Sequence, residues 1–181
     1  MTSSLQGFRK RFPTLTTHID DTAIHALLSA AEECEFSIGD IVIHDNSPSD
    51  KLFFIMEGDL GSYIDRNGEK IELGEMKAGD IAGEVSMFGN CPTTATVGAK
   101  SDCTLLTISK TDLKRLQTSA PELVSQLLRR LSAILAARLL ASDQLLYQQF
   151  AEKVDIESED TASFIRWCTT MYQRMHNHQE M

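Results

Sequence analysis

Several features common to membrane proteins, secreted proteins and enzymes are missing from this sequence. It has no run of about 18 consecutive apolar residues, the length that a membrane-spanning helix needs. Positive charges near the N-terminus are not followed by an apolar stretch, so no signal peptide is expected. The sequence contains no P-loop and no glycine-rich kinase loop, and no motif places a nucleophile beside a base. We therefore expect a cytoplasmic protein that is not an enzyme.

Cysteine is sparse and is not spaced for a metal or redox site. The cysteines are Cys34, Cys91, Cys103 and Cys168. None of them forms a Cys-x-x-Cys pair, so neither zinc nor a redox dithiol is indicated. Their even number allows two disulfides, but reduced thiols are the favoured interpretation for a cytosolic chain of this size. His176 and His178 form a His-x-His motif, and a solvated tail is favoured there over a metal site.

The chain also lacks an excess of basic residues. It has 17 Lys and Arg against 26 Asp and Glu, which gives a net charge of −9 and a pI of about 5.0. Binding to a nucleic-acid backbone requires a basic face, so DNA is not an expected partner. An acidic surface also opposes anionic ligands, so a phosphate site would depend on local geometry. Hydrophobic residues make up 42% of the 181 residues, which indicates a packed core.

Changes in the spacing of the apolar residues divide the chain into four parts. Residues 1–34 form a predicted helical segment. Asp20 or Asp21 can cap the helix that carries its apolar stripe. Residues 35–109 carry short β-rich runs separated by turn residues, and all the glycines except Gly7 lie there. Asn67-Gly68 stands between two such runs and predicts a tight hairpin. We expect an α+β fold built on an antiparallel β-roll.

The third part, residues 110–150, is predicted to be a short helix followed by a long one. Ser109 with Asp112 and Ser119 with Glu122 are possible capping boxes, and the long pattern starts at Pro121. Its apolar seam is wide enough to pack on its own domain and on a second copy, so a homodimer is expected. The predicted dimerisation residues are Leu127, Leu131, Ile134, Leu135, Ala141 and Leu145.

The fourth part, residues 151–181, begins with an acidic linker and continues as an amphipathic helix over about 161–175. Phe164, Trp167 and Met171 lie on one face of this helix. Packing onto its own domain is the favoured role for this face, and binding of a partner protein is the alternative.

Four segments together resemble a known family. They are "FSIGDIVI", "DKLFFIMEGDL", "AGDIAGEVSMFG" and "PTTATVGA". With the helices around them they resemble the cyclic-nucleotide-binding domain of catabolite activator proteins and kinase regulatory subunits, from about Asp20 to Phe150. The resemblance implies a double-stranded β-helix of the jelly-roll type, with a phosphate-binding cassette at residues 83–97. The transcription factors of that family add a winged helix-turn-helix, which needs some sixty residues or more. The sequence ends at residue 181, 31 residues after Phe150, so such a DNA-binding domain is not expected.

The resemblance also implies a ligand site. Its expected residues are Gly83, Glu84, Val85, Ser86, Pro92, Thr93, Thr94 and Ala95. Glu84 matches the carboxylate that accepts a hydrogen bond from the ribose 2′-hydroxyl. Backbone N–H groups of the cassette would face the cyclic phosphate, and the hydroxyls of Ser86 and Thr94 could add donors. The implied ligand is a cyclic nucleotide, cyclic AMP or cyclic GMP, and no other cofactor is expected.

Thr93 occupies the position of the family's phosphate-binding arginine. A hydrogen bond from a threonine hydroxyl contributes about 0.5–1.5 kcal/mol, whereas a charged partner contributes about 1.5–3 kcal/mol and more in a dry pocket. Losing roughly 2–4 kcal/mol would weaken binding by about thirty- to a thousandfold. Glu84 would then lie near the ligand's negative charge without a compensating cation.

Three interpretations follow from this departure. A cation from another segment could replace the arginine; the candidates are Lys51, Lys100, Arg129, Arg130 and Arg138. The site could bind a different small molecule. The domain could also have lost its ligand and serve as an adaptor dimer. By the same resemblance, Ser142 and Asp143 of the long helix would contact a purine edge, although a solvent-facing polar pair is the favoured interpretation. A ligand would act by repositioning the long helix against the roll.

Overall fold

The computed structural model describes residues 4–89 and 91–153, with the backbone alone for residues 145–153. By its contacts the chain divides into two compact units, residues 1–131 and residues 132–181. The boundary falls inside the last described helix, and the first unit contains both β-sheets. The predicted helix at 161–175, Cys168 and the His176–His178 motif lie outside the described residues.

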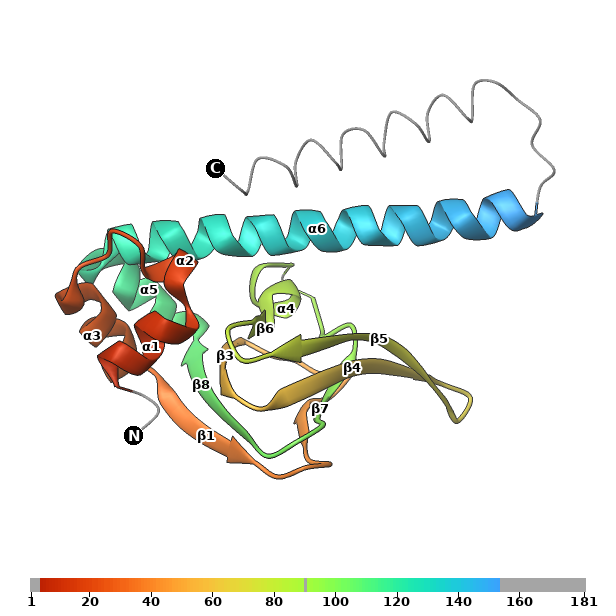
Figure 1. The fold of residues 1–181 in the computed structure, drawn as a ribbon, viewed down its shortest axis with the longest axis horizontal. Helices are drawn as coiled ribbons and strands as arrows, with labels where there is room; N and C mark the ends of the chain where they lie inside the picture. Colours follow the sequence, from red (N-terminus) through yellow and green to blue (C-terminus); the bar gives the residue numbers. More distant parts are fainter. Residues whose placement is uncertain (1–3, 90, 154–181) are drawn as a thin grey trace, which may run out of the picture. The chain divides into compact units, whose positions relative to one another are not determined.

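The first unit contains two four-stranded sheets in which all pairings are antiparallel (Figure 1). The strands are β1 (Glu32–Phe36), β2 (Ile41–Ile43), β3 (Lys51–Glu57), β4 (Asp59–Arg66), β5 (Glu69–Lys77), β6 (Ile81–Ala82), β7 (Thr96–Ala99) and β8 (Cys103–Ser109). One sheet has the order β1-β8-β3-β6 and the other has the order β2-β7-β4-β5. This arrangement confirms the predicted α+β class and the antiparallel roll.

The β4–β5 hairpin forms at the predicted Asn67-Gly68 turn. Asn67 has φ 58° and Gly68 has φ 85°, the left-handed values that a tight hairpin turn requires at both positions. The Gly68 N–H donates to Asp65 Oδ1 at 2.9 Å. The strands pair from Arg66 opposite Glu69 outward, so the turn sets the register of the longest hairpin in the roll.

Strand β3 is buried on both faces, and this links the roll to the N-terminal helices. Phe53 and Ile55 lie in the apolar cluster inside the roll. Phe54, on the opposite face, lies 5.8 Å from Phe8 and 5.5 Å from Phe12 between ring centroids. Buried aromatic area of this kind is a large source of packing energy. The continuous apolar run "LFFIM" therefore fixes the helices against the sheet.

The N-terminal part folds as short helices and not as one long segment. They are α1 (Leu5–Arg11), α2 (Pro13–Thr16) and α3 (Asp21–Ala30). Pro13 occupies the first position of α2, where its missing N–H costs no helical hydrogen bond. Asp20 caps α3, since its Oδ1 accepts from the Ala23 N–H at 2.7 Å. Strand β1 starts at Glu32, so Cys34 lies in a strand inside the predicted helical segment.

Two further helices follow the roll, α5 (Lys110–Ser119) and α6 (Pro121–Lys153). The cap at Ser109 is confirmed, because its Oγ accepts from the Asp112 N–H at 3.1 Å. The predicted second capping box at Ser119 and Glu122 is wrong. Ser119 lies in the last turn of α5, and its hydroxyl donates back to the Arg115 carbonyl at 3.4 Å.

Candidate ligand-binding site

The cassette starts at Gly83, whose backbone only glycine can adopt without strain. Its φ is +88°, and a Cβ at this position would lie 2.4 Å from the Lys51 carbonyl oxygen. Gly83 thereby allows helix α4 (Glu84–Gly89) to begin directly after β6 and close against β3. The sequence predicted a turn here, and the structure gives the contact that requires it.

Glu84 opens α4, and its side chain is only 1% exposed. A buried carboxylate is stable only with polar partners, and Glu84 has such an interaction. Ser86, 5% exposed, donates from Oγ to the Gly83 carbonyl at 3.3 Å. A ribose hydroxyl could therefore reach the Glu84 carboxylate only after neighbouring residues move. The role expected for Glu84 from the family resemblance remains a prediction.

Thr93 is 7% exposed, and its hydroxyl points into the loop between β2 and β3. Its Oγ1 accepts from the Ser47 N–H at 2.9 Å and lies within donating distance of the carbonyl oxygens of His44 and Ser47. Its backbone N–H donates to the Ser47 carbonyl at 3.0 Å, and its carbonyl accepts from the Asn46 N–H at 2.9 Å. We call this set of bonds, between Thr93 and residues 44–47, the Thr93 latch. The residue at the arginine position thus joins two loops.

The structure brings only part of the predicted site to a cavity. A cavity of about 440 Å³ lies beside the cassette. Its lining residues are Pro48, Ser49, Asp50, Ser86, Cys91, Pro92 and Lys110. Of the predicted residues, Ser86 and Pro92 are in this lining. Val85 and Ala95 are half-buried and Thr94 is exposed, outside the lining.

Two of the candidate cations, Lys51 and Lys100, form ion pairs elsewhere on the roll. Lys51 Nζ lies 3.7 Å from Glu32 Oε2. Lys100 Nζ lies 2.8 Å from Glu75 Oε1 and 3.3 Å from Glu72 Oε1. The hydrogen bonds with Glu75 and then Glu72 raise the pKa of Lys100, and the bond from Lys100 lowers the pKa of Glu75. Lys100 therefore forms ion pairs with strand β5 of the β4–β5 hairpin.

Lys110 is a basic residue beside the cavity that the sequence analysis did not consider. It begins α5 and lines the cavity, and its backbone N–H donates to the Asp50 carbonyl at 2.8 Å. No family motif marks Lys110. Its only sequence signal is its place as the first helical residue after the Ser109 cap, at the end of a strand that pairs with β3.

The long helix α6 carries the remaining predicted residues. Leu127 and Leu131 are 0% and 2% exposed within the chain itself, so both pack in the core of the first unit, and their place in a dimer seam remains a prediction. Ile134 is half-buried, Leu135 is 36% exposed and Ala141 is exposed. The Leu145 side chain lies outside the described part of the chain.

Arg129 is exposed and Arg130 is half-buried at the start of α6. Arg138, Ser142 and Asp143 lie farther along the helix, in the second unit, and all three side chains are exposed. The structure thus leaves the purine-edge role of Ser142 and Asp143 as a prediction.

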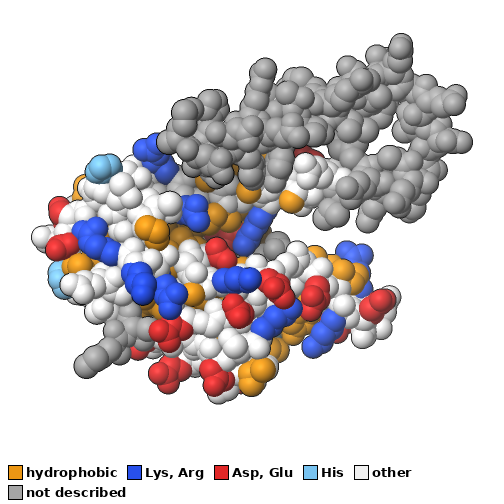
Figure 2. Space-filling view, in the orientation of Figure 1, with side chains coloured by type: hydrophobic (Ala, Val, Ile, Leu, Met, Phe, Trp, Pro, Cys, Tyr) orange, Lys and Arg blue, Asp and Glu red, His pale blue; other side chains and the backbone are white. Residues whose placement is uncertain are grey.

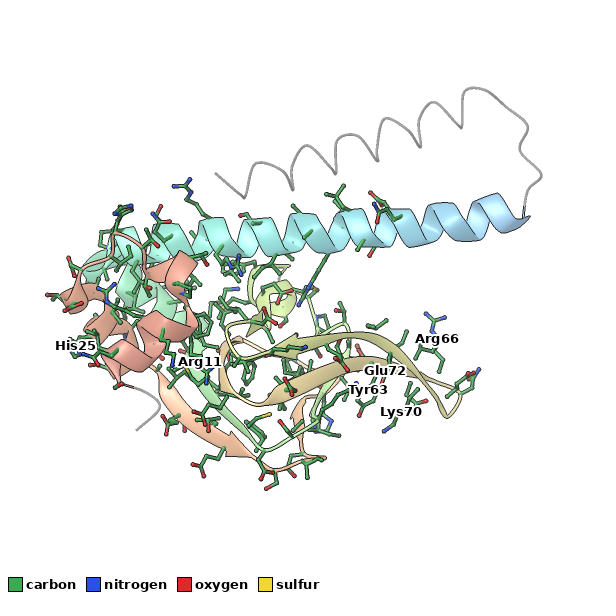
Figure 3. The ribbon with its side chains drawn as sticks, in the orientation of Figure 1. Arg11, His25, Tyr63, Arg66, Lys70 and Glu72 are labelled. Atoms are coloured by element: carbon green, nitrogen blue, oxygen red, sulfur yellow. The ribbon has the colours of Figure 1, made fainter. Side chains whose placement is uncertain are left out.

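The surface charge is mixed in sign. In Figure 2, Lys and Arg side chains alternate with Asp and Glu side chains over the coloured face of the molecule. The β4–β5 hairpin also contains a cation–π contact, with Lys70 Nζ at 4.7 Å from the centroid of the Tyr63 ring (Figure 3).

Within residues 4–89 and 91–153, no three His, Cys, Asp or Glu side chains are grouped for a metal ion. None of the helices described there is both long and apolar enough to span a bilayer.

Comparison with known proteins agrees with this geometry. Residues 33–119 match the family described as the cyclic nucleotide-binding domain. The cGMP-dependent protein kinase egl-4 of Caenorhabditis elegans is 29% identical over 140 residues, which cover 77% of this chain and 17% of the kinase. The chain therefore spans less than a fifth of the length of this curated relative.

Two solved structures share the fold at low identity. A cyclic nucleotide-binding domain from Methylobacillus flagellatus KT superposes with a TM-score of 0.68 at 22% identity, covering 86% of this chain and 88% of that one. The regulatory subunit of a cAMP-independent protein kinase A from Trypanosoma brucei gives a TM-score of 0.58 at 21% identity, covering 71% of this chain and 47% of that one. With its two antiparallel sheets, its glycine-initiated α4 cassette and the family match over residues 33–119, this chain contains a domain of the cyclic nucleotide-binding family.

Proposed function

We propose that this chain is a regulatory module whose affinity for cyclic nucleotides is weakened or lost because Thr93 replaces the phosphate-binding arginine. The observation that carries this proposal is the Thr93 latch. A hydroxyl that already accepts from Ser47 N–H and donates to a loop carbonyl has no second proton for a phosphate oxygen. The burial of Glu84 supports the same conclusion, because the carboxylate that would hold a ribose is covered.

The ligand class of the family remains the first candidate, as cyclic AMP or cyclic GMP. The relative from Caenorhabditis elegans is a cGMP-dependent kinase, which favours that class. The Trypanosoma brucei neighbour is described as cAMP-independent, so the fold also occurs in a protein that does not depend on this nucleotide. A different small molecule is therefore a second candidate, and the cavity beside the cassette favours it. A ligand-free adaptor dimer is the third.

The module would act by contact with a partner protein in a signalling pathway. Binding at the roll would shift the population of positions that α6 adopts, and a homodimer through α6 would transmit that shift. A cytoplasmic location fits the three cysteines of the described residues, Cys34, Cys91 and Cys103, which are all free thiols.

Calorimetry tests the proposal directly. Cyclic AMP and cyclic GMP are titrated to millimolar concentration into the wild-type chain and into Thr93→Arg. We expect weak or undetectable heat for the wild type and at least a tenfold gain in affinity for Thr93→Arg, because a guanidinium adds a charge-assisted contact with the phosphate.

Thr118→Arg is the matched control, since it adds the same charge at an exposed position of α5, away from the cassette, and leaves the Thr93 latch intact. Circular dichroism checks that each variant is folded. Micromolar binding of either nucleotide to the wild type would contradict the proposal. A folded Thr93→Arg variant with no gain would show that the missing guanidinium is not the cause of weak binding.

A further inference from the structure

Strand β5 forms one edge of its sheet, and its outer side is open. Among the strands of residues 4–89 and 91–153, only β4 pairs with β5. All residues from Glu69 to Glu75 are exposed. The end of the β4–β5 hairpin extends beyond the rest of its sheet (Figure 1), because β7 pairs with β4 only as far as Tyr63. An open edge offers backbone N–H and C=O groups to a further strand.

A β-bulge limits the part of this edge that can pair. Tyr63 lies opposite Glu72, while the preceding residue of β4 lies opposite Gly74, so Leu73 is an extra residue in β5. A bulge bends its strand and interrupts the ladder. The regular part of the edge therefore consists of residues 69–72, which we call the edge segment.

The hairpin turn determines which backbone groups of the edge segment face outward. Arg66 and Glu69 flank the two-residue turn and lie opposite each other, so they form a hydrogen-bonded pair. Along an antiparallel ladder, successive residues direct their backbone groups to opposite sides. Glu69 and Ile71 therefore direct their N–H and C=O groups toward β4. Lys70 and Glu72 direct theirs to the open edge.

The side chains of the edge segment are divided between the two faces of the sheet. Lys70 and Glu72 share one face, on which Lys70 lies over the Tyr63 ring and Glu72 accepts from Lys100 Nζ at 3.3 Å (Figure 3). Ile71 lies on the other face and is 43% exposed. A cation and an anion thus flank an exposed apolar residue.

This segment is complementary to itself in the antiparallel direction. When Ile71 lies opposite the Ile71 of a second copy, each Lys70 lies opposite a Glu72. These are also the residues whose backbone groups face outward, so the same register allows the ladder hydrogen bonds to form. Opposite charges directly across two strands stabilise the pair, and like charges destabilise it.

We propose that the edge segment is an interface for a second copy of this chain, in which two β5 strands pair antiparallel about Ile71. Two ion pairs between Lys70 and Glu72 lie on one face, and the two Ile71 side chains cover each other on the opposite face. The contact is isologous, so it closes on two copies. The inference goes beyond the proposed function, since it uses neither the cassette nor α6.

The short edge segment and the bulge keep this association weak and finite. Interfaces that bury little surface are weak, so the pair forms at high protein concentration and dissociates in dilute solution. The bulge at Leu73 stops the pairing from extending along β5. An association through α6 is measured in dilute solution, so the two contacts are distinguished by concentration.

Disulfide cross-linking of Ile71→Cys tests the register directly. The full chain also carries Cys34→Ser, Cys91→Ser and Cys168→Ser, while Cys103 is buried and remains. Opposite residues that exchange no hydrogen bonds have Cα atoms about 4.5 Å apart, and a disulfide needs roughly 4.4–6.8 Å. We expect a cross-linked dimer under mild oxidation at high protein concentration.

Ile41→Cys in the same background is the matched control. Ile41 is 41% exposed, close to the 43% of Ile71, and lies in β2 at the other edge of the same sheet. Chance collisions should cross-link the two variants at similar rates. Pairing of β5 should make Ile71→Cys react about tenfold faster or more, because it raises the effective concentration of the two thiols.

Charge exchange tests the ion pairs in the Ile71→Cys chain. Lys70→Glu places two acids opposite each other, and Glu72→Lys places two lysines opposite each other. Each variant alone should cross-link about fivefold more slowly. A mixture of the two restores opposite charges and should recover the rate, in dimers that contain one chain of each kind. Glu75 still pairs with Lys100 in both variants, and circular dichroism checks that both are folded.

The outcomes decide the inference independently of the cassette. Fast cross-linking of Ile71→Cys that each charge variant loses and their mixture regains supports it. Cross-linking no faster than that of Ile41→Cys overturns it and leaves the edge to another occupant, such as a strand of a partner protein. Equal rates for all charge variants also overturn it, because Lys70 and Glu72 then do not lie opposite each other.

Discussion

The Thr93 hydroxyl has one proton to donate and two backbone carbonyl oxygens within reach, those of His44 and Ser47. Its oxygen also accepts from the Ser47 N–H at 2.9 Å. At 7% exposure this side chain has little access to water, so the Ser47 N–H depends on its oxygen as an acceptor, whereas the Ser47 carbonyl also accepts from the Thr93 backbone N–H. The residue predicted to lie at the family's arginine position therefore has a structural role in its own loops.

Replacing Thr93 by valine should measure the strength of this latch. Valine keeps the shape of threonine and removes the hydroxyl, so the Ser47 N–H loses its acceptor in a partly buried place. We expect the free energy of unfolding to fall by about 0.5–1.5 kcal/mol, the usual net contribution of one hydrogen bond. Urea denaturation followed by circular dichroism gives this value.

Thr93→Ser is the matched control, because it keeps the hydroxyl and should retain most of the stability. A Thr93→Val variant as stable as the wild type would mean that the Thr93 hydroxyl does not stabilise the loop.

For single residues, the sequence predicted which residue lies at a site position better than it predicted the hydrogen-bond partners of its side chain. The match of Thr93 to the arginine position could be made from its neighbours, but its partners His44 and Ser47 lie 46 to 49 residues away in the sequence. No local pattern indicates a hydrogen bond across that distance. Lys110 was missed for the same reason, because its relation to the cavity depends on the pairing of β3 with β8.

Among the elements, the β4–β5 hairpin is held to the rest of its sheet by charge as well as by backbone pairing. Lys100, directly after β7, reaches Glu72 and Glu75 of β5. These pairs are exposed to solvent, so they are screened by salt and contribute little individually. They nevertheless make the hairpin sensitive to pH, because the partners' pKa values shift in opposite directions.

The sign of this pH dependence follows from the two shifts. The pKa of Glu75 is lowered from 4.5 by its bond with Lys100, so its contribution is present above pH 4.5 and is lost as the pH falls through the lower folded value. The pKa of Lys100 is raised from 10.5 by Glu75 and Glu72, so its contribution is present below pH 10.5 and is lost above. Between these limits the stabilisation is constant.

Lys100→Gln should therefore lower stability by a small amount that is the same from about pH 5 to pH 10 and shrinks at both extremes. Thermal unfolding of wild type and variant across this range gives the difference, and 1 M salt should reduce it. Lys114→Gln makes the same change of charge away from the hairpin and should show no such profile. A difference that grows toward acid would reverse the assigned sign.

Elements set by neighbours in the sequence were predicted well, and those set by distant contacts were not. The Asn67-Gly68 hairpin, the Asp20 cap and the Ser109 cap depend on residues within three positions, and all three are confirmed. The Ser119 box was wrong because the Ser119 hydroxyl finds an acceptor inside the preceding turn of α5. The first three residues of β1, Glu32 to Cys34, were placed in the helical segment because only the pairing of β1 with β8 makes them part of a strand.

At the scale of the whole molecule, α6 has buried leucines in its first turns and exposed leucines farther along. Its first turns bury Leu123, Leu127 and Leu131 in the first unit. Farther on, Leu135 and Leu139 are 36% and 63% exposed, and their spacing of four places them on one face of the helix. Exposed leucines at this spacing are typical of a helix that packs against a second chain. The proposed homodimer therefore depends on this later part of α6.

Leu139→Lys should dissociate the proposed dimer without unfolding the protein, because a charge placed in an apolar helix–helix contact is costly and the side chain is exposed within the chain. Sedimentation velocity should show the mass falling to that of one chain. Gln144→Lys, at an exposed polar position of the same helix, adds the same charge and should leave the dimer intact. Leu127→Ala should instead lower the unfolding free energy by about 2–5 kcal/mol, because Leu127 lies in the core. A wild-type chain that sediments as a monomer would contradict the proposed homodimer. A Leu139→Lys variant that stays dimeric would show that this face of α6 does not form the dimer contact.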